Sequence, residues 1–408
     1  MSIWPDPTHL ARAGEKGRLE EAELQVVDPA ALQGDLPGDI SPPPGQAKTG
    51  DRRERLLPRL ADPDAPLLVV EGLTTHFRLG GQTVHAVDDV SFSLEDGEAL
   101  GIAGESGCGK TTTALSLLRL LPSNAEVVGG SVRLFGIDLL TKSDKALQRY
   151  RWREISIIFQ GAMNALNPVQ RVGDQIAEPM IERQGLSKTA AAKRAGELLE
   201  LVGIPKARRK AYPHELSGGM RQRAMIAMAL ACDPAVIIGD EPTTALDVMV
   251  QAQILELLED LREKLGLSLI LITHDLSVLA ETCDRVMIMY AGRVAEEGPV
   301  GLVYGTPRHP YTQMLLAAFP DVHSGRRNLG TIPGSPPDLR TPPPGCRFHP
   351  RCPAAMEVCR TEVPPEVCLD DRVRVACHLY PPGSDGVPVP LPVTRAAVPD
   401  AAVPEEAS

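Results

Sequence analysis

A stretch of nine residues in the first third of the chain has the residue types and the spacing of a phosphate-binding loop. It reads Gly104-Glu105-Ser106-Gly107-Cys108-Gly109-Lys110-Thr111-Thr112. Glycines at this spacing let successive backbone N–H groups curl around phosphates, while Lys110 can reach the β- and γ-phosphates and the hydroxyl of Thr111 can ligate Mg²⁺. We therefore predict a nucleoside triphosphate site that works with Mg²⁺.

The segments on either side of this loop suit that chemistry. Residues 99–103 are apolar and read as a buried strand, and residues 112–121 read as a helix. A loop between such a strand and helix presents bound phosphates to a helix N-terminus, where free N–H groups and the helix dipole favour an anion.

Two adjacent acids, Asp240 and Glu241, follow a second apolar stretch at residues 235–239. Open α/β sheets bind ligands at the carboxyl ends of their strands, which is where these acids would lie. Asp240 could hold Mg²⁺ through water, and Glu241 could orient or deprotonate an attacking water. Taken alone, the pair could equally be an exposed acidic turn.

A third motif, Leu216-Ser217-Gly218-Gly219-Met220, opens a predicted helix over residues 219–232. Ser-Gly-Gly at this place could be an ordinary helix N-cap. It could also be a second phosphate cradle, with Ser217 and the N–H of Gly219 directed at an anion.

Together these motifs resemble the ATP-binding subunits of ABC transporters, whose signature is this Leu-Ser-Gly-Gly. Residues 216–231 and the run Asp240-Glu-Pro-Thr-Thr-Ala-Leu-Asp247 are most similar to the oligopeptide and dipeptide importers within that family. The resemblance covers about residues 67–380. It implies a RecA-like P-loop core of the α/β class, with an antiparallel β subdomain, a helical subdomain and a small cysteine-rich C-terminal extension.

The resemblance also implies roles for single residues. Phe77 would stack on adenine, although core packing is an alternative for an aromatic ring. Gln160 would contact Mg²⁺ and report the state of the site to a membrane subunit, and Asp247 would lie at a dimer seam. His274 would contact the γ-phosphate, and Ser217 with its neighbours would contact ATP held by the Lys110 loop of a second ATPase subunit.

Further expectations concern the organisation of the 408 residues. Residues 1–66 are rich in proline and charge and are expected to be disordered, with a short helix possible near residues 18–26. Residues 67–304 would form the nucleotide-binding domain, with its helical subdomain at about 165–218. Within it, residues 67–70, 74–77, 86–94, 131–135, 155–159 and 269–273 read as strands, and residues 172–202 and 248–265 as helical. Residues 305–380 would form the extension, and 381–408 a disordered tail.

Charge and hydropathy limit the partners that we expect. A net charge of −11 argues against a nucleic-acid partner. No apolar run is long enough to span a bilayer, and the N-terminus lacks the pattern of a secretory signal. We therefore expect a peripheral protein on the cytoplasmic face of the inner or plasma membrane.

Five of the eight cysteines lie in the extension, at Cys346, Cys352, Cys359, Cys368 and Cys377. Disulfides are disfavoured in the cytosol, and we expect the extension to lack a core, so these thiols point to a metal. The spacing does not fit the close pairs of zinc ribbons. The family resemblance implies a [4Fe–4S] cluster on Cys346, Cys352, Cys359 and Cys377, with zinc as the rival. A sixth cysteine, Cys108, is expected beside bound nucleotide, where alkylation would block ATP binding.

The resemblance implies ATP hydrolysis that energises peptide import. Two permease subunits and a second ATPase subunit, a paralogue or another copy, would complete the machine, with an extracytoplasmic solute-binding protein as an indirect partner. Import of nickel or another metal chelate is an alternative. An ABC ATPase of translation or DNA repair is a further one, disfavoured by the acidity and by the single ATP-binding domain. A non-hydrolysing subunit is disfavoured because Lys110, Glu241 and His274 are all present.

Overall fold

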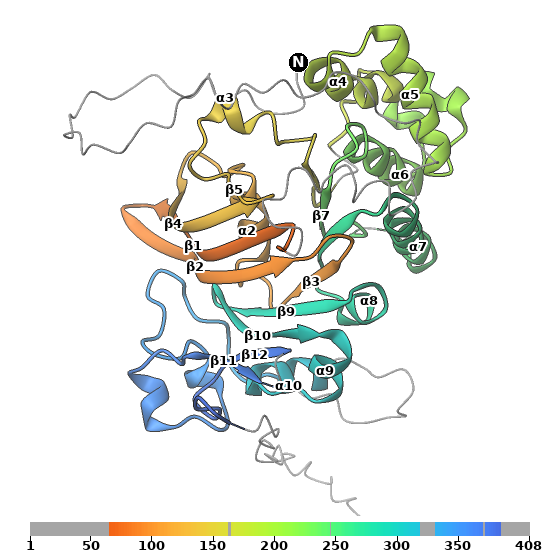
Figure 1. The fold of residues 1–408 in the computed structure, drawn as a ribbon. Coiled ribbons are helices and arrows are strands. Elements are labelled where there is room, and N and C mark those ends of the chain that lie inside the picture. The colour runs from red at the N-terminus through yellow and green to blue at the C-terminus, as the bar shows by residue number, and fades with distance from the viewer. Residues whose placement is uncertain (1–64, 162–164, 245, 319–330, 370–371, 385–408) are drawn as a thin grey trace, which may run out of the picture.

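The computed structural model describes residues 65–161, 165–244, 246–318, 331–369 and 372–384 (Figure 1). The expected helix near residues 18–26, most of the N-terminal extension and most of the C-terminal tail lie outside these ranges. The α-helices are α2 (Lys110–Leu117), α3 (Asp144–Leu147), α4 (Val172–Gln184), α5 (Lys188–Leu201), α6 (Gly218–Ala229), α7 (Val248–Leu265), α8 (Leu276–Thr282), α9 (Val300–Gly305) and α10 (Pro310–Ala317).

The central element is a sheet of eight strands in the order β11-β12-β10-β9-β3-β8-β7-β6. Its strands are β3 (Ala99–Ala103), β6 (Ile155–Ile158), β7 (Val236–Asp240), β8 (Ser268–Ile272), β9 (Arg285–Tyr290), β10 (Arg293–Pro299), β11 (Glu366–Leu369) and β12 (Val373–Ala376). The five strands from β6 to β9 in this order pair in parallel. Every residue of β3, β6, β7 and β8 is buried, as expected for parallel strands covered on both faces. The α/β class predicted from the sequence is confirmed.

A second, antiparallel sheet has the order β2-β1-β4-β5, with β1 (Leu68–Leu79), β2 (Gln82–Leu94), β4 (Ala125–Leu134) and β5 (Ile137–Asp138). The sequence analysis predicted separate strands at residues 67–70 and 74–77, and this is wrong, because β1 runs without interruption from Leu68 to Leu79. Gly72 has φ +59° and lies where the register with β2 shifts between Val70 and Leu73. Glycine here supplies the left-handed backbone of a bulge, which bends a strand without ending it.

The helical segment predicted over residues 172–202 is present as two helices, α4 and α5. Gly185, with φ +71°, ends α4, and the side chain of Ser187 caps α5 by accepting from the N–H of Ala190. Figure 1 shows α4 and α5 beside α6, at the end of the molecule opposite to β11 and β12. Within the described residues, no helix is both long and apolar enough to cross a bilayer.

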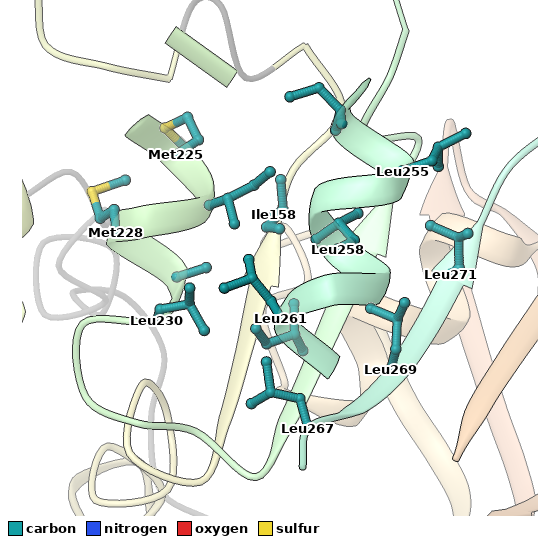
Figure 2. Packing of buried hydrophobic residues seen from close by; sticks show 14 of the residues in the cluster. Ile158, Met225, Met228, Leu230, Leu255, Leu258, Leu261, Leu267, Leu269 and Leu271 are labelled. Carbon is teal, nitrogen blue, oxygen red and sulfur yellow. The ribbon is translucent and has the colours of Figure 1, made fainter. Parts of the chain in front are cut away.

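Helices α6 and α7 pack on one face of the central sheet. Figure 2 shows Leu258 of α7 beside Ile158 of β6, and Met225 of α6 belongs to the same buried cluster. Leu269 and Leu271 of β8 belong to the same buried cluster. This packing fixes the start of α6 and the start of α7 relative to the ends of β6, β7 and β8.

The C-terminal extension is built differently from what the sequence suggested. Strand β12 pairs with β10, so residues beyond 305 extend the central sheet. Val367, Leu369, Val373 and Val375 form a buried cluster with Tyr380, so the expectation that this segment lacks a core is wrong. Alternation along β11 and β12 places one side of each strand inward, which the sequence analysis overlooked because the runs are only four residues long.

Candidate active site

The phosphate loop connects β3 to α2, as predicted, and two of its glycines are required by close backbone approaches. Gly104 has φ +147°, and a Cβ there would lie 2.2 Å from the carbonyl oxygen of Met289. Gly109 has φ +110°, and a Cβ there would lie 2.4 Å from the carbonyl oxygen of Ala86. No side chain among the residues that the structure describes caps the N-terminus of α2, so its first N–H groups are available to an anion.

Lys110 is buried and curls back over this loop. Its Nζ donates to the carbonyl oxygens of Gly104, at 2.7 Å, and Glu105, at 3.1 Å. In loops of this kind the lysine ammonium contacts the β- and γ-phosphates. When a triphosphate binds, the Nζ of Lys110 would therefore donate to phosphate oxygens in place of these two carbonyl oxygens.

Oxygen atoms suited to Mg²⁺ meet beside the loop. The hydroxyl of Thr111 donates to Oδ1 of Asp240 at 3.1 Å, and Asp240 is 1% exposed at the end of β7. Burial raises the pKa of the Asp240 carboxyl, and the hydrogen bond from Thr111 offsets part of that effect. A hydroxyl and a carboxylate are hard donors of the kind Mg²⁺ prefers, so these residues fit the ion.

Glu241 lies at the centre of a polar cluster at the carboxyl ends of β6, β7 and β8. Its Oε2 accepts from Nε2 of Gln160 at 2.7 Å and from the hydroxyl of Thr244 at 2.8 Å. Nδ1 of His274 lies 3.5 Å from Oε1. The structure thus brings together Gln160, Glu241 and His274, which the sequence singled out separately, and adds Thr244, which it missed.

The backbone at Glu241 is unusual for a residue with a side chain. Its φ is +48°, in the left-handed region, and its N–H donates to the carbonyl of Ile272 at 2.8 Å. Such conformations cost about 1–3 kcal/mol and persist where surrounding contacts enforce them, often at functional sites. Here the turn directs the carboxylate toward Gln160 and His274, and the His274 side chain is 70% exposed.

The Ser217 loop lies apart from the phosphate loop. Ser217 is exposed and caps α6, its Oγ accepting from the N–H of Met220 at 3.3 Å, and Asp247 caps α7 by accepting from the N–H of Val250 at 2.9 Å. Gly219 packs so closely on Val250 that a Cβ would lie 2.7 Å from its Cγ1. Across the described residues, no hydrogen bond or ion pair connects either motif to the phosphate loop.

Phe77 is half-buried near the end of β1, opposite Val84 of β2 and Ala125 of β4. It belongs to none of the buried apolar clusters of the described chain. Stacking of this ring on adenine stays a prediction, with packing as the alternative.

The side chain of Cys108, inside the phosphate loop, is buried. It is 4% exposed and packs in the apolar cluster beneath the loop with Leu100 and Met289. Burial raises the pKa of its thiol, and the nearby Lys110 ammonium offsets only part of that rise. That alkylation of this thiol blocks ATP binding stays a prediction, and the burial of the sulfur adds that the reaction should be slow.

Four cysteines of the extension lie near one another without forming a ligand set. The N–H of Cys346 donates to the carbonyl of Cys359 at 2.9 Å, while Cys368 is exposed on β11. Burial raises the pKa of Cys352 to about 11 and that of Cys377 to about 12, and repulsion between the neighbouring thiolates adds to both shifts. Within the part of the chain that the structure describes, no three His, Cys, Asp or Glu residues are placed to hold a metal. The structure therefore does not support the predicted [4Fe–4S] cluster.

The sequence analysis also missed two residues of the extension that contact the phosphate loop. Arg351 forms an ion pair with Glu105, and the hydroxyl of Tyr311 accepts from the N–H of Glu105. No local pattern reveals these contacts, because they join residues more than 200 positions apart.

A glycine-rich loop between a strand and a helix, with paired acids at the carboxyl end of another parallel strand, defines the class of P-loop nucleotide hydrolases. Family models identify the family within this class. Residues 87–244 match the ABC transporter model, and residues 295–359 match the model of the C-terminal region of oligopeptide/dipeptide transporters. The chain belongs to the ATP-binding subunits of ABC transporters, and it is an ATPase.

Individual relatives agree with this assignment. A protein of Brucella melitensis named for peptide import and ATP binding is 52% identical over 72% of this chain and 90% of its own length. A peptide ABC transporter ATP-binding protein of Sinorhizobium fredii is 50% identical over 74% of this chain and 92% of its own length. A solved dimeric ATP-binding cassette with ADP and Pi has a TM-score of 0.52 at 29% identity, covering 57% of this chain and 98% of that one. Another dimeric structure of the same cassette, described as a bacterial ABC transporter cassette, has a TM-score of 0.51 at 30% identity, covering 57% of this chain and 98% of that one.

We predict that Cys108 reacts slowly with a thiol reagent such as iodoacetamide. The thiolate is the reactive form, and burial both hides the sulfur and raises its pKa. The reaction should be at least about tenfold slower than that of the exposed Cys368, measured by mass spectrometry of peptides from the native protein. Equal rates would contradict the buried placement.

Proposed function

We propose that this chain energises the import of peptides through separate membrane permease subunits. One observation carries the catalytic part of the proposal: Gln160, Glu241 and His274 converge beside the phosphate loop. The peptide substrate is supported by the names of relatives at about 50% identity and by the match over residues 295–359.

In the proposed mechanism the protein supplies positioning and charge more than covalent chemistry. Lys110 and the N–H groups at the start of α2 hold the phosphates, and Phe77 stacks on the adenine. Glu241 accepts a proton from the attacking water, and His274 contacts the γ-phosphate. Thr111 and Asp240 would hold Mg²⁺, which supplies neutralisation of phosphate charge, with Gln160 nearby.

The site is proposed to be completed by a second ATPase subunit. Ser217 and Gly219 lie away from the phosphate loop of their own chain, while Ser217 is exposed at a helix N-terminus that suits an anion. A head-to-tail pair would place this loop on the ATP held by the partner, and Asp247 would lie at the seam. The second subunit is another copy or a paralogue. Two permeases, with an extracytoplasmic binding protein beyond them, would complete a machine on the cytoplasmic face of the membrane.

Import of nickel or another metal chelate is the alternative transport function. The solute is selected by other subunits in this scheme, so the residues of the ATP site suit either cargo. The family names of the relatives favour peptides. We propose no nucleic-acid partner, because the chain carries a net charge of −11.

Replacing Glu241 with Gln tests the proposed base. The amide keeps the shape of the side chain but cannot accept the proton, so turnover should fall by about 10²-fold or more while ATP still binds. ATPase rates and binding of a fluorescent ATP analogue measure the two effects. Glu259, an exposed acid on α7, provides the control through Glu259→Gln, which should behave like wild type. Turnover of Glu241→Gln near the wild-type rate would rule out Glu241 as the base.

The [4Fe–4S] cluster on Cys346, Cys352, Cys359 and Cys377 stays a prediction, with zinc as its rival. Four thiolates in one segment suit such a cluster, but no step of the mechanism depends on it. If the cluster is present, anaerobically purified protein should carry about four irons and four sulfides per chain and absorb visible light. Colourless protein with about one zinc per chain would favour the rival, and metal-free protein would contradict both.

A further inference from the structure

Arg351, in the C-terminal extension, forms a paired contact with Glu105, the second residue of the phosphate loop. Its Nη1 donates to Oε2 of Glu105 at 2.6 Å, and its Nη2 donates to Oε1 at 3.0 Å. Both oxygens of the carboxylate are therefore used by one guanidinium. Such two-point, charge-assisted pairs fix orientation as well as distance.

Arg351 is itself held rigidly. Its side chain is 6% exposed, and its Nε donates to the carbonyl of Pro333 at 2.8 Å. Nη1 also contacts the hydroxyl of Tyr290 at 3.2 Å, and the guanidinium carbon lies 5.7 Å from the centre of the Tyr290 ring. The Tyr290 ring packs against Tyr311 and Phe348, with ring centres 4.6 and 5.1 Å away. These contacts with packed aromatic rings hold the Arg351 side chain in the orientation in which it pairs with Glu105.

Tyr311, on α10, holds the same loop residue at its backbone. The N–H of Glu105 donates to the Tyr311 hydroxyl at 2.9 Å, and Tyr311 is fully buried. The carbonyl of Glu105 accepts from Nζ of Lys110 at 3.1 Å. Side chain, N–H and carbonyl of Glu105 are all occupied, the first two by the extension and the third by the lysine that contacts phosphates.

We propose that Arg351 and Tyr311 are positioning residues for ATP: by fixing Glu105 they keep the phosphate loop in the shape that receives phosphates. The inference rests on the ATPase function and deepens it, because it gives the extension a part in nucleotide binding. A loop held in its binding shape loses less conformational freedom when the ligand arrives, so binding is tighter. Arg351 and Tyr311 touch Glu105 and not the reacting atoms, so the chemical step should change little.

The distinguishing signature is a separation of ATP affinity from turnover. For Arg351→Gln we expect the Kd of MgATP to rise about tenfold, because the loop loses both contacts from the guanidinium and has to be ordered when ATP binds. The kcat at saturating ATP should stay within about twofold of wild type. Arg351→Lys keeps the charge but loses the two-point geometry, so it should recover only part of the affinity.

One control and two further tests separate positioning from general stability. Arg360→Gln removes an arginine of the same extension that is mostly exposed, and it should leave the Kd unchanged. Tyr311→Phe removes only the hydroxyl and keeps the ring packing, so it should fold and raise the Kd by about threefold. In a double-mutant cycle, Glu105→Gln and Arg351→Gln together should weaken binding by less than the product of the single effects.

Binding of a fluorescent ATP analogue and steady-state ATPase rates, with thermal unfolding of each variant, give the readouts. Unchanged Kd values for Arg351→Gln and Tyr311→Phe, with only a lower unfolding temperature, would overturn the inference and leave the ATPase function intact. Wild type that binds no ATP, and so is indistinguishable from Lys110→Ala, would instead overturn the function on which the inference rests.

Discussion

The phosphate loop must bring its backbone closer to neighbouring strands than any side chain at Gly104 or Gly109 would permit. The carbonyl oxygen of Met289, near the end of β9, lies against Gly104, and the carbonyl oxygen of Ala86, on β2, lies against Gly109. The loop therefore contacts both sheets, since β9 belongs to the eight-stranded sheet and β2 to the antiparallel one. The shape of the loop therefore depends on both sheets being packed together.

The order of strands in the central sheet gathers the chemistry beside that loop. Strands β3, β8, β7 and β6 are parallel neighbours, so their carboxyl ends share one edge. The phosphate loop follows β3, His274 follows β8, and Gln160 follows β6. Strand β7 ends at Asp240, and Glu241 follows it. The extension adds β12 and β11 at the far side of the same sheet and reaches the loop through Arg351 and Tyr311. One sheet thus positions both the reacting groups and the residues that brace the loop.

The sequence predicted the local parts of this arrangement and missed the distant ones. Glycine spacing predicted the phosphate loop, and apolar runs predicted β3, β7 and β8, because both are set by neighbours in the chain. The continuity of β1 through Gly72, the burial of Cys108 and the pairing of β12 with β10 depend on tertiary packing. The Arg351–Glu105 contact spans 246 positions, and no property of either residue alone distinguishes it from an exposed ion pair.

Hydrogen exchange at the amide of Glu105 tests most directly whether the extension braces the phosphate loop. That N–H donates to Tyr311, and the carboxylate of the same residue pairs with Arg351. Exchange across residues 104–109 should be faster in Arg351→Gln than in wild type or Arg360→Gln, and added ATP should slow it again. The same exchange rates in Arg351→Gln and wild type, with the variant folded, would contradict the account.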